Sequence, residues 1–423
     1  MPNQDKVVIS AFGCITPLGS SYDEIGDALC YGRSGIREIK KYDTRSFKTK
    51  YAFVPELGNE KIRWPHRGPP VIGDILYVRA ALNSLKSHPG YALDQYDPDR
   101  VGCYLGVDEP VADIVQTLKC IFDGEPEATS VRERAAVMAR HFRVSDFLNY
   151  SPVSAMNQVR AAINFAGPAF CHVGLCSASL QAIGSGFHAL QDSRLDAVIV
   201  GGVTAKISPE HLIGLEAADV IATDASVPPE ERSRPFDQWR SGYVPAEGAV
   251  LFVLERQKAV ERRGSQPLLK ILGYGASLNA QHIVKPHTNS LEMILSMKRA
   301  IEDSGIRPDE INLVNAHGTS TQLNDFHESK AINEVFGRRI PITANKSMHG
   351  HMIAAAGAME TLNSLISSQK GFVPGTINLK SQDPRCDVEV VRESREMREQ
   401  TILKNSFGMG GLAATVILQS CAA

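Results

Sequence analysis

The sequence predicts an α/β protein built from two halves of similar plan, and three observations support this prediction. Short runs of branched aliphatic residues recur along the 423 residues with little polar alternation, which is typical of strands covered on both faces. Amphipathic stretches with helical spacing lie between these runs. A helix of small residues followed by an apolar strand occurs once in each half of the chain. Strands that alternate with helices favour an α/β layered architecture.

The expected elements follow one another along the chain. Apolar runs predict strands at residues 7–9, 197–200, 250–254, 268–272, 311–314 and 414–418. Helical spacing predicts helices at residues 74–85, 177–190, 291–304 and 351–368. The third helix should end at Gly305, because glycine readily adopts the left-handed conformation that stops a helix.

A charged segment at residues 255–263, followed by Gly264, marks the junction between the halves. We therefore expect an N-terminal half at residues 1–262 and a C-terminal half at residues 263–423. Two units of this kind also agree with the length of the chain, which exceeds one compact core. Residues 40–150 are rich in proline, glycine and charge, and we interpret them as a cap insertion on the first half.

The composition excludes several classes of protein. With 43% hydrophobic and 22% charged residues, the chain differs from disordered, collagen-like and coiled-coil proteins. Its 45 basic residues nearly balance 47 acidic ones, so no global positive field is available to hold a nucleic acid. No segment supplies the roughly 20 consecutive apolar residues of a membrane span. Nucleic-acid and membrane partners are therefore not expected.

The cysteines and the first residues bear on the compartment. None of the eight cysteines forms a C-x-x-C pair, and a chain of this size does not depend on disulfides for its stability. The first six residues are polar, and the apolar stretch after them contains Gly13 and Pro17. This pattern favours a first strand and turn over a signal peptide. We therefore expect a reducing compartment, most simply the cytoplasm.

Cys176 is the first residue that could carry chemistry. It directly precedes the small-residue helix predicted at 177–190. A thiol at that place meets the positive end of the helix dipole, which should lower its pKa toward a usable thiolate. The alternative is a cysteine that only fills the core beside a helix of small residues.

His317 lies in the motif N-A-H-G-T-S-T at residues 315–321, at the end of a predicted strand. The carboxyl ends of strands are where α/β sheets hold reacting groups. A loop histidine with a structural hydrogen bond is the alternative. Asp325 and Glu328 follow three residues apart on the next helix. Either carboxylate could pair with a buried cation, or both could lie on an exposed face.

His351 ends the motif K-S-M-H-G-H at residues 346–351 and opens the helix predicted at 351–368. The repeat makes its position equivalent to that of Cys176. An imidazole at a helix N-terminus stays neutral more easily and can then donate a hydrogen bond. His349 and His351 have no cysteine or carboxylate partner nearby, so we expect no metal site. Lys346 is interpreted as a salt-bridging lysine.

The motif N-S-F-G-M-G-G at residues 405–411 precedes the last predicted strand. Three glycines in four positions let the backbone approach a ligand, and their N–H groups can stabilise an anion. The motif lacks the Lys-Ser/Thr ending of a P-loop. A glycine-rich turn without a ligand is the alternative.

In order and spacing, Cys176 and these three motifs resemble the elongating β-ketoacyl-acyl-carrier-protein synthases, which are ketosynthases of the thiolase fold. The resemblance runs nearly end to end, because further segments match at residues 8–13, 32–36, 233–237 and 246–249. It implies a thiolase-like fold, with a duplicated five-layer α-β-α-β-α arrangement and a cap insertion in the first half.

The resemblance implies a decarboxylative Claisen condensation. Cys176 would take an acyl group from a carrier thioester, and His317 and His351 would bind the thioester carbonyl of a malonyl-type extender. The enolate left by loss of CO₂ would attack the acyl group and release a β-ketoacyl product. The backbone N–H groups of Cys176 and Met409 would hold the oxyanion.

Further roles follow from the same resemblance. Lys346 and Glu328 match a buried ion pair that supports the histidines. Phe407, Gly408 and Met409 match a mobile gating loop, and Thr319 and Thr321 match substrate-binding positions. The implied partner is an acyl carrier protein that brings its own phosphopantetheine, so the chain needs no cofactor. A homodimer is expected, and a heterodimer with a related subunit is the alternative.

Several residues depart from the family pattern. Gly174 and Leu175 stand where the family has Thr-Ala, and Met409 replaces an aromatic residue. Asp108, Glu109 and Pro110 replace a small, aliphatic stretch at the border of the acyl pocket. These changes favour a specialised polyketide or fatty-acid pathway. The basic residues that dock the carrier protein have only loose counterparts, at positions 63, 66 and 67 (Arg63, His66 and Arg67).

Three other functions compete with this hypothesis. A thiolase would need a second cysteine near the glycine motif, and residues 405–413 contain none. A non-catalytic, chain-length-setting partner subunit typically lacks the nucleophile, whereas Cys176 is present. A homologue that only decarboxylates or only transfers acyl groups stays open, because the residues beside Cys176 are altered.

Overall fold

The structure is a computed structural model that describes residues 5–57, 73–109, 130–141, 151–192, 194–282 and 284–421. The cap insertion expected at residues 40–150 lies partly outside these ranges. The loosely matching docking residues Arg63, His66 and Arg67 lie outside them entirely.

One mixed sheet organises the described residues. Its eleven strands lie in the order β12-β10-β9-β14-β15-β8-β1-β7-β6-β4-β5. The first-half strands are β1 (Val7–Ile15), β4 (Val101–Gly106), β5 (Ala169–His172), β6 (Ala197–Thr204) and β7 (Gly248–Arg256). The second-half strands are β8 (Leu269–Leu278), β9 (Leu313–Asn315), β10 (Pro341–Thr343), β12 (Glu389–Val390), β14 (Thr401–Phe407) and β15 (Leu412–Ser420). All residues of β1 and β6 are buried, as expected for strands covered on both faces.

The strand order repeats between the halves. Numbered one to five in chain order, and apart from the edge strand β12, the strands of each half lie in the same order. From the outer edge of the sheet to its centre that order is 3-2-4-5-1. Residues 7–9 of β1 pair antiparallel with residues 269–271 of β8 and so join the halves. The duplication that the sequence pattern predicts is therefore present in the topology.

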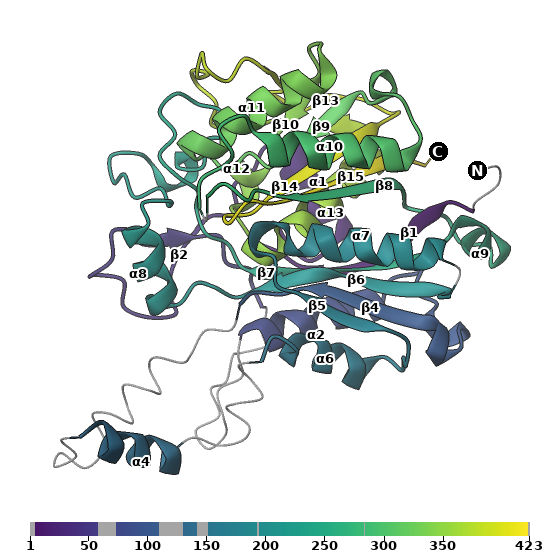
Figure 1. Cartoon of the computed structure of the whole chain (residues 1–423), viewed down its shortest axis with the longest axis horizontal. Coiled ribbons are helices and arrows are strands. Elements are labelled where there is room, and N and C mark those ends of the chain that lie inside the picture. Colours follow the sequence, from purple (N-terminus) through teal and green to yellow (C-terminus); the bar gives the residue numbers. More distant parts are fainter. Residues whose placement is uncertain are drawn as a thin grey trace.

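Helices cover and separate the two halves of the sheet in five layers (Figure 1). The outer layers are α2 (Gly73–Lys86) with α6 (Ser154–Ala162), and α10 (Leu291–Ser304) with α11 (Gln322–Phe336). The middle layer holds α7 (Ala178–Gln191) and α13 (Ala356–Gln369). A Cβ atom on Gly357 would lie 2.8 Å from the Cβ of Leu180. This close approach is why the two central helices need small residues.

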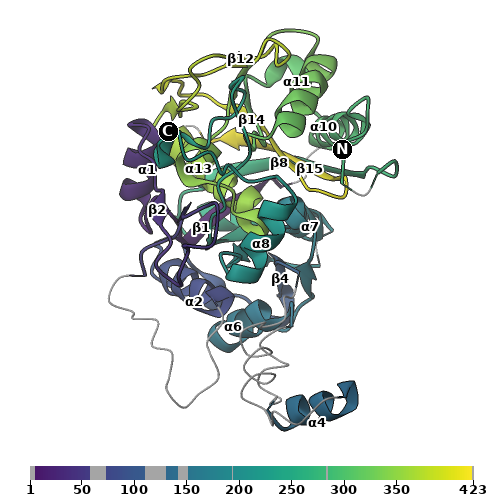
Figure 2. The same cartoon turned by 90° about the vertical axis from the view of Figure 1, so that its left-hand side faces the viewer.

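The described residues form five further α-helices, which are α1 (Tyr22–Cys30), α4 (Val131–His141), α8 (Pro209–Ala217), α9 (Gln257–Arg262) and α12 (Lys346–His349). Two short antiparallel strand pairs join β2 (Arg37–Glu38) to β3 (Tyr51–Ala52) and β11 (Phe372–Val373) to β13 (Arg395–Glu396). Figure 2 shows α1 beside the central helix α13, where Gly26 lies against Ile366 and Lys370. Across the described residues, no helix is long and apolar enough to cross a membrane.

One predicted helix begins later than expected. The sequence places its start at His351, but α13 begins at Ala356 after a 3₁₀ turn at Ile353–Ala355. The His351 N–H donates to the Val244 carbonyl at 2.8 Å, and the His351 carbonyl accepts from Ala246 at 3.0 Å. These two hydrogen bonds hold His351 in an extended segment, so the helix starts only beyond it.

Candidate active site

Cys176 lies in a sharp turn between β5 and α7. The turn is a 3₁₀ segment, Leu175–Ser177, in which Leu175 has a φ of 48°, a left-handed conformation that leucine rarely adopts. The Ser177 hydroxyl donates to the Gly174 carbonyl at 2.8 Å and fixes the turn. The Cys176 side chain therefore projects ahead of the helix, as the sequence predicts, and the residue is 6% exposed.

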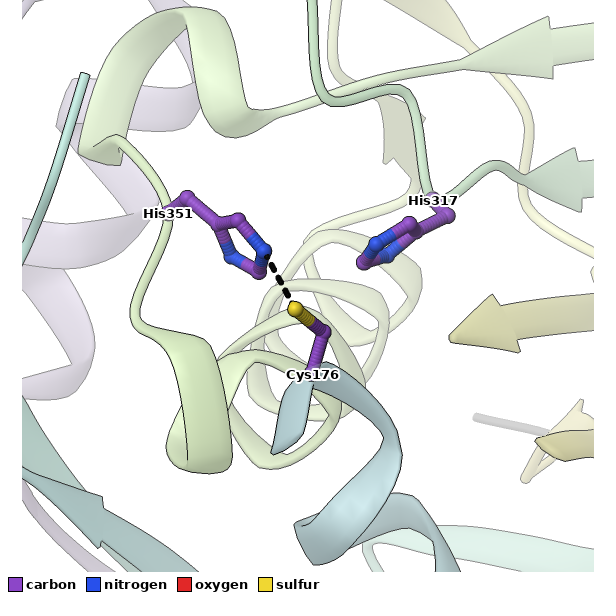
Figure 3. A group of neighbouring side chains, drawn as sticks. All are labelled: Cys176, His317 and His351. Carbon is purple, nitrogen blue, oxygen red and sulfur yellow. Dashed lines mark hydrogen bonds between the residues drawn. The ribbon is translucent and has the colours of Figure 1, made fainter. Parts of the chain in front are cut away.

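His351 reaches Cys176 from the second half of the chain. Its Nε2 lies 3.0 Å from the Sγ of Cys176 (Figure 3). The predicted equivalence of these two residues is wrong. Leu175 and Ile353 each begin the 3₁₀ turn before a central helix, and both have a positive φ. Ala354 is thus the counterpart of Cys176, and His351 lies three residues earlier.

His317 follows β9 and faces the same space. The imidazole rings of His317 and His351 lie 5.3 Å apart at 80°, and both point toward Cys176 (Figure 3). One nitrogen of each histidine and the Cys176 sulfur all lie within 4.8 Å of one another. The structure thus brings together the three residues that the sequence predicts to be catalytic.

Both histidines are neutral in this environment. Burial lowers the pKa of His317 and of His351 well below the usual value, and the nearby Lys346 ammonium lowers it further. The Nδ1 of His317 lies 3.1 Å from the Lys346 Nζ. Since an ammonium group can only donate, this nitrogen accepts, and the ring carries its proton on Nε2.

Cys176 is a thiol, not the thiolate that the helix dipole predicts. Burial raises the pKa of Cys176 to about 12, while Lys346 and the backbone N–H groups of Met409 and Cys176 act in the opposite direction. Desolvation of a buried sulfur anion outweighs these favourable contacts. The resting pair is therefore a thiol and a neutral imidazole.

The predicted ion pair between Lys346 and Glu328 is wrong. The Lys346 Nζ lies 2.5 Å from the Oε1 of Glu360 on α13, and the other oxygen of Glu360 lies 2.7 Å from the Nζ of Lys404 on β14. All three side chains are fully buried. Burial alone would raise the pKa of Glu360, but the two lysines together hold it below its ordinary value.

Glu328 instead supports the backbone of the His317 loop. Its two oxygens accept from the N–H groups of His317 at 2.7 Å and Gly318 at 2.9 Å. The side-chain amide of Asn405 donates to it at 3.2 Å. Asp325, the other candidate for a buried ion pair, lies 3.4 Å from Arg240.

Sequence reasoning missed Glu360 and Lys404. The available signal was a single charged residue inside an otherwise apolar or small-residue element. Glu360 lies within the predicted helix at residues 351–368, and Lys404 precedes the glycine motif. Ionised side chains are rarely fully buried without a partner, so each of them pointed to a buried counter-ion.

The remaining predicted residues lie close to this centre. The Phe407 ring lies 5.9 Å from the His317 ring, and a Cβ on Gly408 would lie 3.5 Å from the Cys176 nitrogen. The hydroxyls of Thr319 and Thr321 lie 2.9 Å apart. The gating role of residues 407–409 and the substrate-binding role of the two threonines stay predictions.

A sulfur and two imidazole nitrogens within 4.8 Å also have the composition of a zinc site. The electrostatics oppose that function. The ammonium groups of Lys346 and Lys404 lower the pKa of both histidines, and the same positive charges would repel a divalent cation. His349, the other histidine considered for a metal, is buried but is not part of this cluster.

Comparisons with known proteins agree with this geometry. Residues 76–259 match the family model of the β-ketoacyl synthase N-terminal domain, and residues 268–380 match that of the C-terminal domain. The chain is 30% identical to 3-oxoacyl-[acyl-carrier-protein] synthase 2 of Coxiella burnetii, over 98% of both chains.

Solved structures of similar proteins superpose on nearly the whole chain. A type II polyketide ketosynthase in complex with its acyl carrier protein has a TM-score of 0.87 at 23% identity, covering 99% of this chain and 100% of that one. The ishigamide ketosynthase/chain length factor has a TM-score of 0.84 at 28% identity, with the same coverage. These likenesses confirm the thiolase-like fold that the sequence predicts.

Proposed function

The chain belongs to the β-ketoacyl synthase family, and we propose on this premise that it condenses an acyl group on Cys176 with a malonyl-type extender. The donor of both groups would be an acyl carrier protein, and the product a β-ketoacyl-carrier thioester. One observation carries the proposal: the Cys176 thiol meets the neutral His351 imidazole at 3.0 Å, with His317 facing both.

The first step transfers the acyl group to the enzyme. The Cys176 sulfur attacks the carbonyl of the incoming thioester, and its proton passes to the Nε2 of His351. The backbone N–H groups of Cys176 and Met409, which already favour negative charge at this sulfur, stabilise the oxyanion. The carrier sulfur then leaves and takes the proton from His351, which returns the imidazole to its neutral form.

The second step removes CO₂ from the extender. The carbon–carbon bond to the carboxylate breaks, and its electron pair becomes an enolate whose oxygen accepts a hydrogen bond from the Nε2–H of His317. Neutral imidazoles suit this task, because they donate a hydrogen bond without giving up the proton. Lys346 contacts the Nδ1 of His317 and thereby keeps the donating proton on Nε2.

The third step forms the new carbon–carbon bond. The enolate carbon attacks the acyl carbonyl, and the bond between that carbonyl and the Cys176 sulfur breaks. The sulfur leaves as a thiolate and takes up one proton, so each turnover consumes a proton and releases CO₂. The high pKa of the buried Cys176, about 12, favours this return to the thiol.

The partners follow from the same reaction. We propose an acyl carrier protein as partner, a homodimer as the working assembly, and no metal or cofactor bound by the chain itself. A heterodimer with a related subunit is the alternative, and the mass of the purified chain in solution separates the two. The cysteines in the described ranges are free thiols, which suits a reducing compartment such as the cytoplasm, and we place the reaction in a specialised polyketide or fatty-acid pathway.

Intact-mass spectrometry with loaded carrier proteins tests the proposal. We expect an acyl adduct on the wild-type chain, and a β-ketoacyl-carrier product once malonyl-carrier protein is added. Cys176→Ala should give neither. Cys171→Ala is the matched control, because Cys171 lies on β5 five residues earlier and is only partly buried. Absence of any adduct, together with activation of a separate ketosynthase on mixing, would show a chain-length-setting subunit instead.

A further inference from the structure

Four polar side chains form a cluster beside the active site that the reaction does not use. We call Asp108, Glu109, Lys206 and Tyr243 the polar cluster. Asp108 and Tyr243 are 7% and 5% exposed. The Glu109 Oε1 forms an ion pair with the buried Lys206 ammonium at 2.5 Å.

The fold places this cluster against the reacting groups. A Cβ on Gly106, the last residue of β4, would lie 2.3 Å from the Ser179 nitrogen at the start of α7. Asp108 follows two residues later and accepts from the Thr204 hydroxyl at the end of β6, at 2.7 Å. The chain that carries Asp108 therefore leaves the sheet beside the first turn of the nucleophile helix.

Tyr243 connects the cluster to the catalytic histidine. Its ring packs edge-on against His351, with the ring centroids 4.9 Å apart. Tyr243 also belongs to one apolar cluster with Cys176 and with Ile207, the neighbour of Lys206. The polar cluster and the reaction centre thus share one wall of side chains.

Apart from the Lys206 ammonium, which has its ion pair with Glu109, three atoms of the polar cluster lack a hydrogen-bond partner within the described part of the chain. They are the Oδ1 of Asp108, the Oε2 of Glu109 and the hydroxyl of Tyr243. Buried polar atoms are nearly always hydrogen-bonded in folded proteins. Unpaired atoms gathered on one wall of an enzyme site indicate that a ligand supplies the partners.

A neighbouring carboxylate provides the contrast. Glu247 is 1% exposed and is fully engaged by protein groups. It accepts from the Tyr77 hydroxyl and from the Ile207 N–H, both at 2.8 Å, and it pairs with Lys41. Glu247 is therefore structural, whereas Asp108 and Tyr243 keep free hydrogen-bonding capacity.

The charge of the cluster limits what the ligand can be. Glu109 and Lys206 neutralise each other. Burial, followed by the nearby Asp74, raises the pKa of Asp108 well above its usual range, so this carboxyl is neutral and can donate as well as accept. These four side chains carry no net charge and suit neutral oxygen groups better than a carboxylate, which the neighbouring Asp74 would repel.

We propose that the acyl chain carried on Cys176 bears keto or hydroxyl oxygens that hydrogen-bond to Asp108 and Tyr243. This inference rests on the proposed function and defines its substrate class. A saturated chain would leave the polar atoms of the cluster buried and unpaired, and an enzyme site disfavours a substrate that does so. An oxygenated chain supplies the missing partners.

The test compares acyl groups of equal length. Pantetheine thioesters of hexanoate, 3-hydroxyhexanoate and 5-oxohexanoate are offered to the wild-type chain, and the rate of adduct formation on Cys176 is followed by intact mass. We expect at least one oxygenated thioester to load about tenfold faster than hexanoate, the factor that one well-made hydrogen bond supplies. Equal loading, or faster loading of hexanoate, would overturn the inference.

Single substitutions then identify the side chains that cause the preference for an oxygenated chain. Tyr243→Phe removes only a hydroxyl that has no partner among the described residues, and Asp108→Leu removes the carboxyl, so both should bring the loading ratio toward one. Asp108→Asn keeps a donor and an acceptor and should retain the preference. Tyr274→Phe is the matched control, because Tyr274 packs against Gly184, eight residues beyond Cys176 on α7.

The outcomes separate this inference from the proposed function. If no thioester acylates Cys176 in the folded wild-type chain, the proposed function itself is wrong. If hexanoate loads readily, and if Tyr243→Phe and Asp108→Leu leave the ratio of oxygenated to hexanoate loading rates unchanged, the proposed substrate class is wrong. The proposed condensing function is not contradicted by that result. A ratio that falls in Tyr243→Phe but not in Tyr274→Phe supports the assignment.

Discussion

The two central helices start in the same way but carry different chemistry. Both α7 and α13 follow a 3₁₀ turn whose first residue has a positive φ, 48° at Leu175 and 30° at Ile353. The turn before α7 holds the thiol of Cys176, whereas its counterpart before α13 holds Ala354. One geometry therefore serves a reacting group in the first half and packing in the second.

The surroundings of the two helices differ in charge. The buried residues of α7 are uncharged, whereas α13 carries Glu360 between the lysines of α12 and β14. In the proposed reaction this difference divides the work between the halves. The first half supplies the nucleophile, and the second half supplies neutral histidines held by buried charges, together with the Met409 N–H group near the sulfur.

The largest expected effect tests whether the nucleophile is confined to the first half. Cys176→Ala should lower the rate of condensation by about 10⁴-fold or more, because removing a nucleophile removes the covalent route. Decarboxylation of malonyl-carrier protein should continue, since His317 and His351 remain. Release of CO₂ and formation of β-ketoacyl product are measured in parallel, and loss of both in a folded variant would contradict the division.

The second substitution removes a histidine of the second half and leaves the first half unchanged. His317→Ala should lower the rate of decarboxylation by about 100- to 1,000-fold, the usual effect of removing one donor to a developing oxyanion. Acyl loading of Cys176 should change much less, because His317 is not the partner of the thiol. Single-turnover loading assays and CO₂ release distinguish the two steps. Equal losses in both would mean that the halves do not act separately.

A third prediction concerns stability and the buried charges of the second half. Glu360→Gln leaves Lys346 and Lys404 without their shared counter-ion, so the free energy of unfolding should fall by about 3–5 kcal/mol. Urea denaturation measures it. Adding Lys404→Met to this variant removes one unpaired cation and should recover part of the loss. Glu328→Gln, which loses one hydrogen bond to the His317 loop, should cost less, about 1–3 kcal/mol.

Sequence reasoning found the features that are local and missed those that depend on packing. Cys176, His317 and His351 each lie in a short motif at the end of a strand or before a helix, so their neighbours along the chain identify them. The ion-pair partner of Lys346 could not be chosen in this way. Glu328 and Glu360 are both carboxylates on helices, and only the packing of α13 against α12 and β14 brings Glu360 to the lysine.

The state of the thiol was missed for the same reason. A helix start favours a thiolate, and that effect can be predicted from the position of Cys176 alone. Desolvation depends on everything that packs around the sulfur, and here it raises the pKa to about 12. The three-residue error in the position of His351 has a similar origin, because the backbone pairing with Val244 and Ala246 that delays the helix comes from a distant segment.

The smallest expected effect is a pH dependence of stability that comes from Lys404 in the second half. Burial lowers the pKa of Lys404 to about 8, although Glu360 acts to raise it, whereas the pKa of lysine in an unfolded chain is about 10.4. Between these values the unfolded chain binds more protons, so stability increases with pH. From pH 8 to pH 10 the gain is about 2 kcal/mol. The corresponding first-half strand, β6, carries no ionisable side chain and contributes nothing comparable.

Lys404→Met removes this contribution and leaves the other titrating groups in place. The unfolding free energy of the wild type minus that of the variant should therefore rise by about 2 kcal/mol from pH 8 to pH 10, as followed by urea denaturation at each pH. Because the other groups titrate in both chains, their effects cancel in this difference. Parallel curves would mean that Lys404 stays protonated throughout, bound more tightly by Glu360 than its burial implies.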